Sequence, residues 1–213
     1  MHMKLHWDGV FMWRRLFALI LAGACVLLLL AGVILTREQR QLSDKLIRLH
    51  VVADSDQPLD QAVKLRVRDA VLRRTQTLLA NTDQPEAAIR DHLDTIRLAA
   101  QNCLKSLGRT DEVQVRFGKE LFPTREYDTF SLPAGVYRSL RVQIGSGKGH
   151  NWWCVVYPSL CLTAGMDEME LAAEQAGLTD DELRLITEAD EGFTVKFKSI
   201  ELLQKLKNFL TDR

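Results

Sequence analysis

Residues 46–80 read LIRLHVVADSDQPLDQAVKLRVRDAVLRRTQTLLA, and they predict a β-strand, a tight break and a long helix in succession. The strand is expected over Leu46–Ala53, which is rich in β-branched residues and ends on two valines. Asp54–Asp56 breaks it. Pro58 suits the first turn of a helix, where its missing N–H costs nothing. Apolar residues at helical spacing continue the helix to about Ala80.

The segment after this helix predicts a second helix and three more strands. An acidic cap at Asp83 and apolar residues at helical spacing predict a helix that stops at Gly108. Alternation of apolar and polar residues then predicts strands near Val113–Phe117, Val136–Ile144 and Trp152–Tyr157. The expected fold is therefore α+β: a small mixed or antiparallel sheet with two long helices packed on it.

The C-terminal part is acidic and then apolar again. Residues 166–191 hold ten acidic residues and one basic residue, and a capping box at Thr179–Glu182 predicts two short helices there. Phe193–Lys198 alternates as a strand, and Ser199 is expected to cap a last amphipathic helix.

An apolar run precedes all of these elements. Leu16–Leu35 reads LFALILAGACVLLLLAGVIL and carries no charge. A helix of this length spans roughly 30 Å, the thickness of a bilayer's hydrocarbon core. It is longer than the apolar part of a usual signal peptide, about 7–15 residues, so a retained anchor and a slowly cleaved signal both stay open. Basic residues before the run favour a cytoplasmic N-terminus.

The expected organisation follows from this run. We predict a cytoplasmic segment over residues 1–15, one transmembrane or signal-anchor helix over 16–35, a linker over 36–45, and an extracytoplasmic domain over 46–213 with an acidic helical insert at 166–191. Of the 28 basic and 28 acidic residues, three basic and one acidic lie before position 37, which leaves 25 and 27 beyond it. This near-neutral balance gives no support for nucleic-acid binding.

Two segments resemble known ligand-binding motifs, a phosphate-binding loop and a calcium-binding loop, but neither has the residues that its motif requires. A phosphate-binding loop at Gly145–Gly149 would need glycine where Val142 stands and serine or threonine where Gly149 stands. The acidic residues at positions 54, 56 and 60 do not follow a calcium loop, since Leu59 stands where that loop needs glycine. We therefore expect no cofactor, no metal and no small-molecule substrate.

A catalytic alternative rests on His50 and Cys154, with Asn151 near the cysteine. This order is that of a thiol peptidase, so an extracytoplasmic hydrolase, either such a peptidase or a cell-wall enzyme, is the alternative function. Cys154 and Cys161 could instead form a disulfide, or both could be buried thiols. Trp152 and Trp153 must face opposite sides of their strand, so one indole could face a partner unless both sheet faces are covered.

Three blocks of the sequence resemble the stage II sporulation protein R family. They are residues 46–70, from LIRLHVVADSD through DQAVKLRVRDA; residues 122–161, with Phe122-Pro123, Pro133-Ala134-Gly135 and GSGKGHNWWCVVYPSLC; and Val195–Lys198 before the terminal helix. The family often has asparagine where Asp54 stands and proline where Ser159 stands. The acidic span 166–191 matches no pattern of the family.

The resemblance implies an intercellular signalling protein that is not an enzyme. Such proteins are exported across the forespore membrane into the intermembrane space, either anchored by a single membrane span or released after signal cleavage. There they activate a membrane-embedded aspartic protease that processes pro-sigma-E. We hypothesise that the partner-binding residues are Gly147, Lys148, Gly149, His150, Asn151, Trp152 and Trp153, with His50, Asp54 and Asp56 nearby, and that a Cys154–Cys161 disulfide holds the loop.

Overall fold

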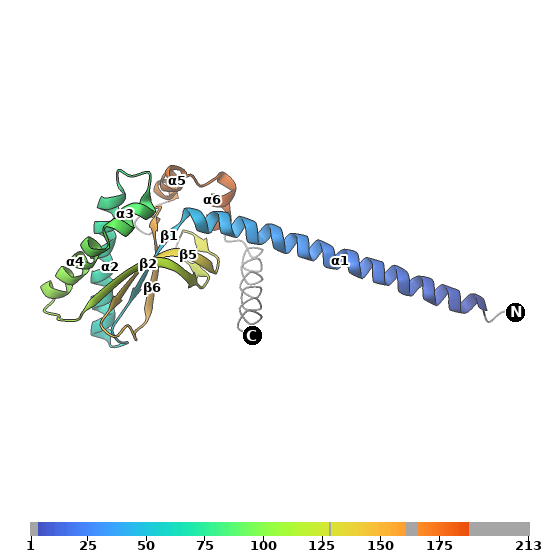
Figure 1. Cartoon of the computed structure of the whole chain (residues 1–213), viewed down its shortest axis with the longest axis horizontal. Coiled ribbons are helices and arrows are strands. Elements are labelled where there is room, and N and C mark those ends of the chain that lie inside the picture. The colour runs from blue at the N-terminus through green and yellow to red at the C-terminus, as the bar shows by residue number, and fades with distance from the viewer. Residues whose placement is uncertain (1–3, 128, 161–165, 188–213) are drawn as a thin grey trace. The chain divides into compact units, whose positions relative to one another are not determined.

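The computed structural model describes residues 4–127, 129–160 and 166–187 (Figure 1). It divides into two compact units, residues 1–40 and residues 41–213, and each is described by itself. The first consists of most of helix α1, and the second contains the sheet and the remaining helices. The predicted strand at Phe193–Lys198 and the predicted helix after Ser199 lie outside the described residues.

Helix α1 (Lys4–Lys45) is continuous over 42 residues, so residues 36–45, expected as a linker, are helical. Large apolar side chains of its N-terminal and central part are exposed: Trp13, Leu16, Phe17, Leu19, Ile20, Leu21, Val26 and Leu27. Over the described residues, no helix meets the combined length and hydropathy of a membrane span. The span predicted at residues 16–35 therefore stays a prediction.

The second unit is built on a mixed four-stranded sheet in the order β2-β5-β1-β6. The strands are β1 (Ile47–Val52), β2 (Val113–Phe122), β5 (Gly135–Ile144) and β6 (Asn151–Tyr157). Strand β1 pairs parallel with β5 and antiparallel with β6, and β2 pairs antiparallel with β5. This arrangement confirms the predicted small mixed sheet. All six residues of β1 are buried, because it has a strand on each side and a covered face above and below.

Three helices lie on one side of this sheet: α2 (Pro58–Leu79), α3 (Pro85–Asp91) and α4 (Leu93–Ser106) (Figure 1). Their apolar faces pack with alternate residues of the strands, and the core between them includes Leu49, Val51, Val67, Val71, Ile96, Ala100, Leu104, Leu140, Val142 and Cys154. Burying apolar surface on this scale is the main term that stabilises the unit.

The prediction of a single helix between Asp83 and Gly108 is wrong, because the helix is interrupted at His92. The imidazole Nδ1 of His92 donates to the carbonyl of Ala88 at 2.8 Å, the acceptor that a continuous helix would reserve for the backbone N–H of residue 92. That N–H donates instead to the carbonyl of Ile89 at 3.2 Å, and φ at His92 is −118°. A local side-chain bond thus replaces a helical one.

A second hydrophobic cluster lies on the other face of the sheet. It includes Leu42, Leu46, Phe122, Phe130, Leu132, Tyr137, Val155, Met169 and Ile186. Helices α5 (Met166–Gln175) and α6 (Asp180–Thr187) contribute to it, so the two predicted acidic helices are confirmed. The capping box also forms, with Thr179 N donating to the Glu182 carboxylate at 2.8 Å. A small hairpin of β3 (Arg125–Glu126) and β4 (Ser131–Leu132) escaped prediction, because strands of two residues leave no alternation to detect.

Arg48 of β1 is a fully buried cation on this second face. Its guanidinium lies 4.2 Å from the centre of the Phe122 ring and 4.9 Å from that of Tyr137, and Nη2 donates to the Tyr127 hydroxyl at 2.9 Å. Its Nε and Nη1 atoms are buried without a hydrogen-bond partner. The two rings offset part of the desolvation cost, but no carboxylate among the described residues neutralises the charge.

We predict that Arg48→Met raises the free energy of unfolding by about 1–2 kcal/mol, since an apolar side chain of similar length removes the buried charge. For a chain of this size the midpoint of thermal unfolding should rise by about 2–8 °C. Arg48→Lys, which keeps a charge but loses the planar stacking, should be less stable than the wild type. Calorimetry of the full chain in detergent measures both, and a Met variant that unfolds at a lower temperature than the wild type contradicts the prediction.

Candidate partner-binding site

The turn after β1 and the connection from β5 to β6 lie at the same edge of the sheet, because β1 and β5 are parallel. The structure therefore brings Asp54 and Asp56 against the loop predicted to bind a partner. Backbone N–H groups of the loop donate to this turn: Ser146 N to the Asp54 carboxylate at 2.6 Å, Lys148 N to the Asp54 carbonyl at 3.0 Å, and Gly149 N to the Ala53 carbonyl at 3.0 Å.

Two glycines allow this close approach. A Cβ on Gly149 would overlap the carbonyl oxygen of Ser55, and a Cβ on Gly145 would overlap the Asp54 side chain. Gly145 also has φ at +52°, a conformation that glycine adopts without steric cost. The glycine-rich sequence thus serves backbone packing against the Asp54–Asp56 turn.

Three ionisable side chains stand on the exposed rim of this loop. His150 and Asp56, with 77% and 55% of their side chains exposed, contact each other through the imidazole Nδ1 and a carboxylate oxygen. The backbone N–H of His150 also donates to the Asp56 carboxylate at 2.6 Å. Lys148 is exposed, and nothing in the described part of the chain binds its ammonium group.

Lys64 of α2 supports the loop from beneath. Its ammonium donates to the His150 carbonyl at 3.0 Å and to the Gln61 side chain at 2.6 Å. Burial lowers the pKa of Lys64, and the nearby Asp56 opposes that shift. The position of the loop over α2 explains why this lysine is buried.

The paired tryptophans face opposite sides of the sheet, as the strand prediction requires. Trp152 packs on the helix side, where the Arg68 guanidinium lies 4.4 Å from its ring centre. Trp153 stacks on His50 at 3.8 Å between ring centres. Each indole is only partly exposed, so both sheet faces are covered within the unit. Direct contact of either ring with a partner stays a prediction.

A buried polar network anchors β6 to the centre of the sheet. His50 is almost fully buried, its Nδ1 donates to the Glu120 carboxylate at 2.8 Å, and its Nε2 lies 2.8 Å from Oδ1 of Asn151. The Glu120 carboxylate also accepts hydrogen bonds from Ser139 at 2.9 Å and Arg141 at 2.8 Å. Burial raises the pKa of Glu120, but these three donors outweigh it and bring the pKa down to about 2.

Glu120 was missed because the predicted strand stopped at Phe117. Extending the alternation to Phe122 places Glu120 and Phe122 on the same face as His50, which is the signal that could have found it. The network holds Asn151, the first residue of β6, and hence the end of the candidate loop. The Glu120 carboxylate, acting through His50, thus positions Asn151 at the site.

The histidine and the cysteine of the hydrolase alternative do not meet, although His50 lies 2.8 Å from Asn151. Cys154 lies in the core on the helix side, whereas His50 faces the opposite side of the sheet. A thiolate–imidazole pair between them is therefore not formed. The described segments also contain no group of three or more side chains arranged to hold a metal ion. Cys161 lies outside the described residues, so its disulfide with Cys154 stays a prediction.

We predict that Gly149→Ala destabilises the chain by about 1–3 kcal/mol, because the added methyl group must displace the backbone of Ser55. Gly118→Ala in β2 is the matched control, since a Cβ there meets nothing within 4 Å. Chemical unfolding followed by tryptophan fluorescence measures both variants. Equal stability of the two would show that the close approach at Gly149 is not required.

We predict a pH-dependent contribution from Glu120. Because folding lowers its pKa from 4.5 to about 2, its stabilisation is full above about pH 5 and is lost as the pH falls toward 2. Glu120→Gln should cost roughly 3 kcal/mol near neutral pH and much less at pH 2. The exposed Glu126→Gln controls for charge. A cost of Glu120→Gln that is the same at both pH values contradicts the prediction.

Residues 43–167 match the family described as Stage II sporulation protein R. The Stage II sporulation protein R of Bacillus subtilis (strain 168) is 37% identical over 123 residues, which are 56% of this chain and 55% of that protein. The chain thus spans about half the length of this curated relative. No solved structure matches the chain. The matched region includes the whole candidate loop and the turn that packs against it.

Proposed function

Because this chain belongs to the stage II sporulation protein R family, we propose that it is a sporulation signal that activates a membrane-embedded aspartic protease, which then processes pro-sigma-E. In this proposal the chain acts as a ligand of the protease and does no chemistry itself. The partner-binding site is the loop Gly145–His150 together with the first residues of β6.

The observation that carries the proposal is that the backbone of this loop is hydrogen-bonded to the neighbouring turn while the ionisable side chains of its rim are exposed. Ala53, Asp54 and Asp56 accept hydrogen bonds from backbone N–H groups of the loop. A loop that is already ordered loses little conformational entropy when it binds a partner. Lys148 and His150 are then available for recognition without rearrangement of the sheet.

Activation requires a difference in affinity between two states of the protease. A ligand that bound the inactive and active states equally would shift nothing, however tightly it bound. The exposed rim therefore has to contact a surface that changes between the two states. In our proposal this surface lies on the extracytoplasmic side of the protease, and its active form is self-associated.

The proposed location is the intermembrane space, reached by export across the forespore membrane. The support is the uncharged run at residues 16–35, whose large apolar side chains between Leu16 and Leu27 are exposed in the isolated chain. Such a surface is costly in water and favourable in lipid. Both a retained anchor and release after cleavage are compatible with the proposed signal.

We predict that Lys148→Glu lowers activation at least tenfold without loss of stability, because it reverses an exposed charge at the centre of the loop rim. The assay adds the full chain to vesicles that hold the protease and pro-sigma-E, and it measures processed sigma-E. Lys119→Glu is the matched control, since Lys119 is also exposed but lies on strand β2.

Either of two results would contradict the proposal. Wild-type chain that fails to stimulate processing in the presence of an intact protease would remove the activator role. Stimulation that is equal for the wild type and Lys148→Glu would remove the loop rim from the contact while leaving the activator role in place.

A further inference from the structure

The described arginines of the folded unit differ in their partners. Six of them form ion pairs with carboxylates: Arg68, Arg90, Arg97, Arg109, Arg138 and Arg141. Arg66 and Arg73 of α2 are exposed, and neither guanidinium group has a hydrogen bond or an ion pair to any residue that the structure describes. The carboxylate between them on the helix, Asp69, pairs with Arg68 at 2.7 Å.

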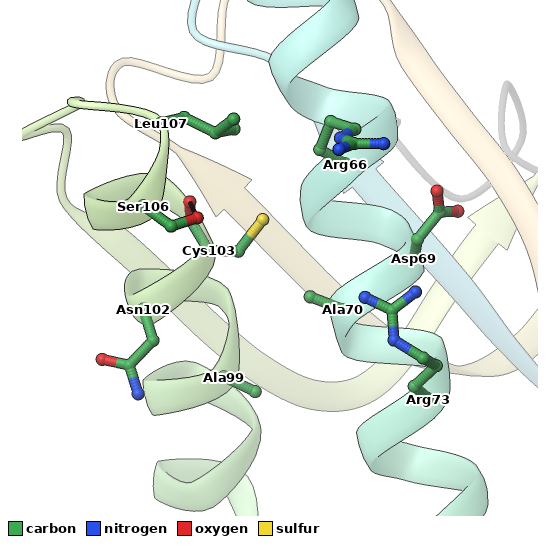
Figure 2. Close-up of a pocket in the computed structure, with 9 residues that line it drawn as sticks. All are labelled: Arg66, Asp69, Ala70, Arg73, Ala99, Asn102, Cys103, Ser106 and Leu107. Carbon is green, nitrogen blue, oxygen red and sulfur yellow. Dashed lines mark hydrogen bonds between the residues drawn. The ribbon is translucent and has the colours of Figure 1, made fainter.

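Arg66 and Arg73 both line one pocket. The pocket has a volume of about 480 Å³ and lies between α2 and α4. Figure 2 shows Arg66 and Arg73 on α2 and Cys103 and Ala99 on the facing side of α4. The pocket exists because the residues that face each other across it are small, so the two helices leave space between their backbones.

The lining combines the two arginines with the carboxylate of Asp69, which is already paired with Arg68, and with a short apolar floor. Ala70, Ala99 and the Cys103 methylene form the apolar part, and Asn102 adds an amide on the α4 side. Guanidinium groups bind carboxylates through paired N–H donors, and such charge-assisted hydrogen bonds are stronger than neutral ones. Two cations without partners beside one pocket therefore favour an acidic ligand.

The spacing of the two cations selects the kind of ligand. Arg66 and Arg73 are seven positions apart on a helix, which separates their Cα atoms by about 10.5 Å. A peptide in the polyproline II conformation advances about 3.1 Å per residue with three residues per turn, so side chains three positions apart lie on the same side, about 9 Å from each other. We propose that the α2–α4 pocket binds an acidic polypeptide segment of a partner protein, with one carboxylate on Arg66 and a second on Arg73. This site is separate from the loop proposed above and does not depend on its role.

Cys103 provides a reporter inside the pocket. It is a free cysteine, it is partly exposed, and its sulfur points from α4 toward α2 (Figure 2). Burial raises the pKa of its thiol, against the opposing effect of Arg66 and Arg73. A peptide that lies across the pocket would cover this thiol and slow its alkylation.

The test uses the full chain in detergent and a fluorescein-labelled peptide, Gly-Glu-Gly-Gly-Glu-Gly, with its Gln counterpart as the neutral probe. Fluorescence anisotropy should show binding of the Glu peptide that weakens with added salt. Arg66→Gln and Arg73→Gln should each weaken it about tenfold, as expected for the loss of one charge-assisted contact. Arg74→Gln is the matched control, since Arg74 follows Arg73 on α2 but does not line the pocket; it should change binding less than twofold.

A second readout locates the peptide. Saturating Glu peptide should slow alkylation of Cys103 several-fold, measured by mass spectrometry of the Cys103 peptide, and the Gln peptide should not. The proposal is overturned if the Glu peptide does not bind, if Arg74→Gln weakens binding as much as Arg73→Gln, or if Cys103 stays unprotected. Binding of vesicles with anionic lipids through Arg66 and Arg73, without binding of the Glu peptide, would also overturn it and assign the pocket to a membrane surface.

Discussion

The pairing of β1 with a strand on each side is the interaction on which the rest of the second unit depends. The parallel pairing with β5 brings the turn Asp54–Asp56 to the edge where the loop Gly145–His150 leaves the sheet. The antiparallel pairing with β6 carries the chain directly back from that loop. One strand thus positions both halves of the candidate site, and the hydrogen bonds between the two halves hold the loop in shape.

Strand β1 also determines which side chains are buried on each face of the sheet. Leu49 and Val51 enter the core under the helices, whereas Arg48 and His50 enter the opposite face. Burying two polar side chains there is costly unless they find partners. His50 finds Glu120 and Asn151, and this network ties the start of β6 to the centre of the sheet. Arg48 finds aromatic rings and one hydroxyl, which makes it the least satisfied group of the described core.

Much of the fold could be predicted because its signals are local. Period-two alternation identified three strands of the sheet, and a run rich in β-branched residues identified β1. Helical spacing with an N-terminal proline identified α2 within a residue of its observed end. Predictions failed where one side chain changed the local outcome. His92 competes for a helical carbonyl and splits the expected helix in two. No periodicity reports such a bond, and none reports a hairpin with two-residue strands.

The sequence by itself determined the elements, the family, and the residues of the candidate loop, because each is written in a contiguous stretch of the chain. Only the tertiary structure decided which of these residues meet. It placed His50 and Cys154 on opposite faces of the sheet, and it joined His50 to Glu120, seventy positions away. It also left the Arg66 and Arg73 guanidinium groups beside a pocket with no partner among the described residues, while Arg68 on the same helix pairs with Asp69. Pairing of side chains depends on strand order and helix packing, which act between segments that are distant in the chain.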